Sequence, residues 1–193
     1  MRSTPASPST CAAQPALAGP RHHLSPMPID DADEVRALTQ LFAELGAPHP
    51  ERWARTQVEH GVPQLARFLF LRAAWRHVLA DGDTGWIDGT IAASRAQPDA
   101  PFAGVGAALA RLREAGARDA DVSEVVRGMQ AAVLFALCQL LDGAPAAEPE
   151  VADVGWALVQ VTPEGDVVAP IPALHASLLD TDPTGREMRP AAS

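Results

Sequence analysis

The 193-residue sequence contains no lysine and no tyrosine, so all 15 of its basic side chains are arginines. These face 24 Asp and Glu residues, and the formal net charge is −9. Residues 1–29 hold two arginines and no acid, which leaves 13 arginines against 24 acids, or −11, in the remainder. Because an acidic domain repels phosphate groups, we expect no nucleic-acid partner and no docking to an anionic membrane.

Cysteine is also scarce. The two cysteines are too few for a disulfide framework, and Cys11 and Cys138 lie in segments with no evident reason to meet. This usage is typical of a reducing compartment, and we expect a cytoplasmic protein. Cys138 stands in the most apolar stretch and is expected to be a small buried hydrophobe.

Recognisable catalytic and cofactor motifs are missing. The sequence has no G-x-S-x-G, and Gly104-Val-Gly106 lacks the third glycine of a dinucleotide loop. The run DGDTGWIDG from Asp81 begins like a calcium loop, but Trp86 occupies the sixth position, where glycine is required. His77 and Asp81 could supply two metal ligands, yet spacing shows no third. We therefore expect no cofactor and no metal, and lean against an enzyme.

The composition, 47% hydrophobic, suits one sizeable core. Residues 1–29 are rich in Pro, Ser and Ala and are expected to be disordered, and Met27 is hypothesised to be the true start because helical patterning begins at Asp30. An intact mass of the natively expressed protein would test that hypothesis. Residues 30–181 are predicted to form a single helical domain, and residues 182–193 a polar C-terminal tail.

Glycine and proline residues divide the domain into segments with helical spacing of apolar residues. The predicted helices cover residues 31–45, 51–59, 63–80, 84–97, 102–115, 119–141 and 172–179. A β-hairpin is predicted near 156–169, with strands 156–161 and 167–169 joined by a Thr-Pro-Glu-Gly-Asp turn. The fold class is mainly α, formally α+β: a compact bundle of six or seven helices with a small C-terminal hairpin.

The segment 131–141 is apolar on every side except at Gln139. A helix that is hydrophobic all round is expected to be buried all round, so we place this helix at the centre, packed against residues 63–80. Arg127, Gln130 and Gln139 interrupt the roughly 20 apolar residues that a membrane span needs, which argues against insertion.

Ser123, Arg127 and Gln130 share one face of that helix. Arg127 should not be buried without a carboxylate or a bound anion beside it. The face could form the floor of a polar pocket, although a structural ion pair is the favoured interpretation.

Two further sets of candidates remain. Arg72 and Arg76 lie one turn apart and repel each other, so we expect an anionic group nearby. The loop acids are the favoured partners over a bound ligand, and these are Asp81, Asp83 and Asp88. Near the C-terminus, His175 and Asp182 are weak candidates for general acid–base work, with Arg186 as a ligand-binding residue. A capped helix and a solvated tail are the favoured alternative there.

Three function classes follow. The first is a non-catalytic protein that binds a protein partner or associates with itself, and immunity against a basic toxin would be one instance. The second is an enzyme or binder of small anions or other small ligands. Its pocket would be built from Arg127, Gln130, His175, Asp182 and Arg186. The third, nucleic-acid binding, would require arginines clustered on one face. We expect the first.

Overall fold

The computed structural model describes residues 30–143 and 154–190, so the predicted tail at 1–29 and residues 191–193 lie outside it. Within these ranges the chain forms seven α-helices, a short 3₁₀-helix and a two-stranded antiparallel sheet, which confirms the mainly α fold with a small hairpin. The helices are α1 (Asp31–Glu44), α2 (Pro50–His60), α3 (Gln64–Trp75), α4 (Trp86–Ala96), α5 (Ala103–Glu114), α6 (Asp119–Leu141) and α7 (Leu174–Leu178). The 3₁₀-helix η2 spans Leu179–Thr181, and the strands are β1 (Val159–Val161) and β2 (Val167–Pro170).

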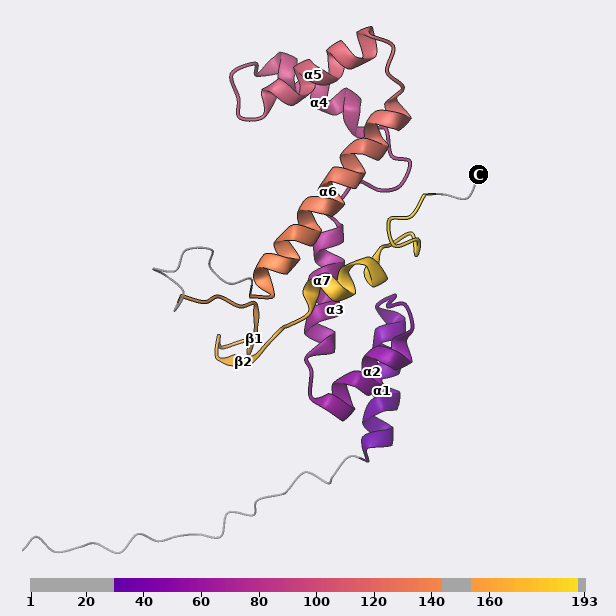
Figure 1. Ribbon diagram of the computed structural model, residues 1–193, viewed down its shortest axis with the longest axis vertical. Coiled ribbons are helices and arrows are strands. Elements are labelled where there is room, and N and C mark those ends of the chain that lie inside the picture. Colours follow the sequence, from indigo (N-terminus) through magenta and orange to yellow (C-terminus); the bar gives the residue numbers. More distant parts are fainter. Residues whose placement is uncertain (1–29, 144–153, 191–193) are drawn as a thin grey trace, which may run out of the picture.

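The helices are arranged along one long axis, with α1 and α2 near one end and α4 and α5 at the other (Figure 1). The helices α3, α6 and α7 connect the two ends, and the hairpin extends from the C-terminal side of α6 (Figure 1). The predicted helices are therefore laid out along this axis, with the predicted hairpin beside the central ones.

Three clusters of buried side chains hold the elements together. Leu71, Trp75, Cys138 and Leu174 belong to the largest, which joins α3, α6 and α7. The second cluster joins α1, α2 and α3, and the third joins α4 and α5 to the first turns of α6. The expected contact between the two apolar helices, now α3 and α6, is therefore present in the largest cluster.

The expectation that α6 is buried on all sides is wrong. Its buried residues are Ser123, Arg127, Ala131 and Cys138, which follow one another at helical spacing along a single stripe. The opposite side exposes a second apolar stripe, with Val125 65% and Met129 61% exposed. Hydrophobicity all round a helix shows that water is unfavourable on every side, and residues 30–143 and 154–190 cover only one side of α6.

The length argument against a membrane span also fails. In the described part of the chain, α6 is the one helix long and apolar enough to cross a membrane by length and composition, and only 17% of its most apolar window is buried. Length and composition alone do not distinguish a membrane span from a helix that docks against protein.

Two other predictions are corrected. The helix predicted to reach residue 80 ends at Trp75, where the chain turns through short-range bonds such as that from the Val78 amide to the Trp75 carbonyl. This turn presents the Leu79 backbone to α6, where side chains of α6 bind it. The predicted polar tail from residue 182 begins instead with a buried side chain, Asp182, and Met188 packs on the largest cluster.

Candidate functional site

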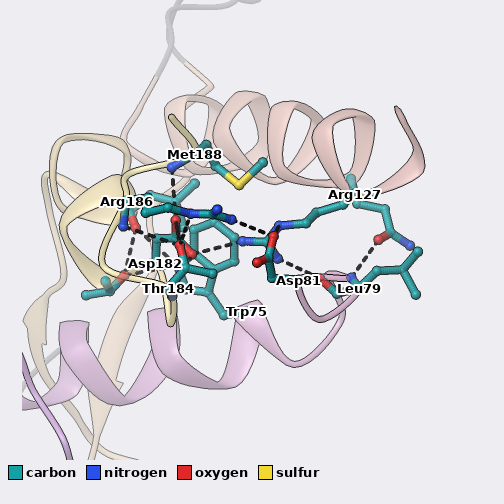
Figure 2. Close-up of polar contacts among 11 residues, drawn as sticks. Trp75, Leu79, Asp81, Arg127, Asp182, Thr184, Arg186 and Met188 are labelled. Atoms are coloured by element: carbon teal, nitrogen blue, oxygen red, sulfur yellow. Dashed lines mark hydrogen bonds and ion pairs between the residues drawn. The ribbon is translucent and has the colours of Figure 1, made fainter. Parts of the chain in front are cut away.

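The buried polar centre of the molecule is an ion pair between α6 and the segment that follows η2 (Figure 2). Arg127 Nη2 donates to Asp182 Oδ1 at 3.0 Å, and Arg127 Nη1 donates to the Leu79 carbonyl at 2.6 Å. The Arg127 side chain is 6% exposed and that of Asp182 is fully buried. Trp75 lies beneath, with the guanidinium carbon 5.8 Å from its ring centroid. The partner that Arg127 requires is thus a carboxylate of the same chain.

Asp182 is surrounded by donors. Its carboxylate accepts from the backbone amides of Thr184 and Met188 and from the Thr184 hydroxyl (Figure 2). Burial by itself would raise the pKa of Asp182, but these hydrogen bonds and the Arg127 charge outweigh burial and lower that pKa overall. Asp182 is therefore an ionised structural group, and it is poorly suited to exchange protons near neutral pH.

Two further candidates join this cluster. Arg186 Nη2 donates to Asp81 Oδ1 at 2.5 Å, and that oxygen lies 4.0 Å from Arg127 Nε. Gln130 Oε1 accepts from the Leu79 amide at 2.8 Å. These polar atoms are used to fasten the loop after α3 and the C-terminal segment onto α6.

His175 belongs to α7 and lies apart from these residues, next to the C-terminal end of α6. Its Nδ1 is 2.5 Å from Asp142 Oδ2, and the same carboxylate accepts from the backbone amides of Leu174 and His175. Burial would raise the pKa of Asp142, but the hydrogen bonds from these two amides and from the imidazole lower it overall. Asp142, which sequence reasoning missed, caps the first turn of α7. The five residues proposed to form one pocket therefore do not converge on one cavity.

The arginine pair on α3 does not bind the loop acids. Arg72 Nη1 donates to the Leu45 carbonyl at the C-terminal end of α1, at 2.7 Å. The loop acids have other partners, since Asp81 pairs with Arg186 and Asp88 pairs with Arg113 of α5. Arg76 is exposed and forms no ion pair within the described residues. A carbonyl at a helix end carries partial negative charge, so Arg72 is satisfied by a neutral backbone group and not by the anionic group that we expected.

Part of the molecular surface formed by α5 and α6 is unusually apolar. Exposed large hydrophobic side chains gather on α6 and α5, and we call them the α5–α6 apolar surface. Its eight members are Phe102, Val105, Leu112, Val125, Met129, Val133, Leu137 and Leu140. Single exposed hydrophobic residues are ordinary, whereas large contiguous groups of them are characteristic of protein or membrane interaction sites.

Two grooves lie along this surface. One, of about 740 Å³, is bounded by α4, α5 and α6, with Phe102, Leu112 and Val125 in its lining. The other, of about 550 Å³, runs between α6 and the end of α3, past Met129 and Leu137. Val125, Val126 and Gln130 line both grooves, which therefore adjoin. Their linings are almost wholly apolar, as is typical of a groove that receives a hydrophobic helix face.

Phe102 stands at the edge of this surface in an uncommon backbone conformation. It is 88% exposed and has φ 67°, a region that L-residues other than Gly, Asn and Asp seldom adopt. An exposed aromatic ring held in such a conformation is a good candidate for an anchor in an interface.

The chemistry available elsewhere is limited. Within residues 30–143 and 154–190, no three His, Cys, Asp or Glu side chains are placed to hold a metal ion together. Burial raises the pKa of Cys138 to about 11, and its thiol is fully buried, which makes it a poor nucleophile. The indole N–H groups of the four tryptophans all have acceptors, as expected of structural anchors.

Comparison of the chain with protein-family models, with curated proteins and with solved structures found no match. The functional interpretation therefore depends on the geometry and chemistry of the chain itself.

Proposed function

We propose that this protein is a non-catalytic assembly protein that binds a second copy of itself through the α5–α6 apolar surface. The observation that carries the proposal is the second apolar stripe of α6, which no other described element covers. Leaving such a stripe in water is unfavourable, because burying an aliphatic side chain in full contributes about 1.5–3 kcal/mol, and these partly exposed side chains forgo a share of that free energy.

The charge distribution along α6 supports a second copy as the occupant. Residues 128–141 carry no charge, and in the first two turns Asp119 and Asp121 are ion-paired with Arg113 and Arg118. The stripe therefore offers no charge for a partner of opposite sign to match. Two copies of it can pack against each other about a two-fold axis without bringing unpaired like charges together.

The buried ion pair supports protein docking over membrane insertion. Arg127 and Asp182 bind each other on the covered side of α6, where the C-terminal segment is fastened. A single helix crossing a bilayer would have to release that segment and leave Arg127 without its partner in hydrocarbon, which is costly. A surface-bound orientation would keep the pair, so lipid binding is an outcome that the experiment must distinguish.

Light scattering at tens of micromolar protein tests the proposal. We expect the wild type to have twice the mass of one chain, and Met129→Glu to reduce it to the mass of one chain. Val168→Glu is the matched control, because Val168 is 55% exposed on the hairpin and does not belong to this surface. A monomeric wild type would contradict the proposal. Loss of the dimer in Val168→Glu alone would move the interface to the hairpin. Binding to neutral phospholipid vesicles that Met129→Glu abolishes would make the surface lipid-facing.

A further inference from the structure

A polar cavity, separate from the two apolar grooves, is lined by residues of α2, α3, α7 and η2. These elements meet in the half of the molecule that holds α1 (Figure 1). Its volume is about 140 Å³, and its lining includes Arg52, Trp53, Gln64, Arg67, Ser177 and Asp180. A cavity of about 150 Å³ in another protein accepts a benzene molecule, so this one can hold a ligand of roughly six non-hydrogen atoms.

Arg67 is the reason to expect a ligand there. The residue is 7% exposed, and its one hydrogen bond runs from Nη1 to Gln64 Oε1 at 3.1 Å. Its Nε is buried without any hydrogen-bond partner among the described residues, and no described carboxylate lies within ion-pair distance. Burial lowers the pKa of Arg67, although the Asp142 charge partly opposes that effect. A buried guanidinium with one neutral acceptor is costly, since buried charges are normally paired.

The contrast with Arg127 shows that this chain does satisfy a buried arginine where a structural role requires it. Arg127 is buried to the same degree and binds a carboxylate and a carbonyl oxygen. Among the described residues Arg67 binds only the side-chain amide oxygen of Gln64, and it lines an open cavity. The group that would complete Arg67 is therefore to be sought in that cavity.

Other donors surround the same space. The N-terminal end of α2 borders the cavity through His49 and Arg52, and this helix end has no side-chain cap. The dipole of the helix favours an anion at such an end, although Pro50 has no N–H and the Arg52 amide already donates to the His49 carbonyl. Arg52 forms no ion pair within residues 30–143 and 154–190 and is exposed at the rim. Ser177, which is 9% exposed, adds a hydroxyl to the lining.

We propose that this cavity binds a small oxyanion, a carboxylate or phosphate group, held by the Arg67 guanidinium, Arg52 and the N-terminal end of α2. A guanidinium fork matches the spacing of two oxygens of such a group. Asp180 is the one carboxylate in the cavity lining and stands at its exposed edge. Its negative charge offsets part of the positive charge of Arg52 and Arg67, which favours a singly charged ligand over a more highly charged one.

Isothermal titration calorimetry with acetate and with inorganic phosphate, at constant ionic strength and near neutral pH, tests the proposal on the full chain. We expect saturable binding of at least one of them, and stronger binding of acetate would identify a carboxylate site. Arg52→Ala should weaken the binding by about tenfold, because it removes a charge-assisted contact. Arg55→Ala is the matched control, since Arg55 lies on the same helix but pairs with Glu51 at 2.7 Å.

Two further variants test the role of the cavity. Asp180→Asn should tighten the binding of either anion, because it removes the nearby negative charge. Arg67→Met should abolish binding while leaving the melting temperature of the free protein unchanged or higher, since it replaces an unsatisfied buried charge by an apolar side chain. If Arg67→Met does not fold, the comparison of anion affinities between Arg52→Ala and Arg55→Ala still tests the proposal. No saturable heat with either anion, or equal affinities in Arg52→Ala and Arg55→Ala, would overturn the proposal. Neither result would depend on whether the protein forms the dimer proposed above.

Discussion

Arg127 of α6 binds Asp182, 55 residues later in the chain, through a buried contact of 3.0 Å. Replacing Arg127 with Ala would leave Asp182 buried without its counter-charge. We expect Arg127→Ala to lower the free energy of unfolding by about 3–5 kcal/mol, as measured by urea denaturation.

Arg118→Ala provides the control for that loss. Arg118 pairs with Asp121 at 2.7 Å, but the two side chains are 80% and 56% exposed, so removal of Arg118 should change the free energy of unfolding very little. Equal stability of Arg127→Ala and Arg118→Ala would show that the Arg127 pair is solvated, contrary to the structure.

The pH dependence of stability should reveal the contributions of two hydrogen-bonded carboxylates, Asp142 and Asp182. Hydrogen bonds lower the pKa of Asp142 and of Asp182 in the folded state below the ordinary value of about 3.9. The unfolded chain then binds protons at a higher pH than the folded chain does. Their contribution to stability is therefore fully present above about pH 4 and is lost as the pH falls through the folded-state values.

Urea denaturation midpoints across the acid range measure this effect. Asp142→Asn and Asp182→Asn should each be less stable than the wild type near neutral pH, and each should lose less stability on acidification. A variant whose stability falls with acid as steeply as that of the wild type would show that its carboxylate does not contribute.

The helix boundaries were accessible from sequence because they depend on local chemistry. Asp30 caps α1, and Gly46 and Gly61 adopt positive φ after α1 and α2, as their positions in the sequence indicated. The turn of the hairpin was predicted on the same basis, with Gly165 at φ 95°. The end of α3 was not predicted, because the turn after Trp75 is fixed by contacts with α6 rather than by a glycine or proline.

Less of the candidate site could be predicted from the sequence, because its side chains bind partners that are distant in the sequence. Sequence reasoning identified the need of Arg127 for a partner, but it could not assign Asp182 to that role. It gave Arg67 no role, although the sequence shows this arginine inside an apolar helix, because only the tertiary structure shows that the side chain is buried and unpaired. Hydropathy likewise could not show which side of α6 the chain itself covers.

Close packing between α4 and α5 depends on Gly106. A Cβ added there would lie under 3.0 Å from the Thr90 carbonyl oxygen and from Ser94 Cβ. We expect Gly106→Ala to destabilise the fold by about 1–3 kcal/mol, because the helices must separate. Gly104→Ala is the matched control, since nothing lies within 4 Å of a Cβ there and alanine favours a helix by about 1 kcal/mol over glycine. Thermal denaturation should move the two melting temperatures in opposite directions, and a shift in the same direction would contradict the packing described.

Cys138 should be protected from thiol reagents in the folded protein. Its side chain is fully buried against α3 and α7, and burial raises its pKa to about 11. At pH 8 only about a thousandth of such thiols would be ionised, compared with roughly a quarter of unperturbed ones.

A Cys11→Ser variant isolates Cys138, and its reaction with a chromogenic disulfide reagent can be followed with and without urea. We expect slow labelling of the native protein and rapid labelling after unfolding. The native rate should rise in Arg127→Ala, because a less stable fold opens more often. Fast labelling of the native variant would mean that the face of α6 which bears Cys138 is open to solvent, and that the largest hydrophobic cluster is not closed.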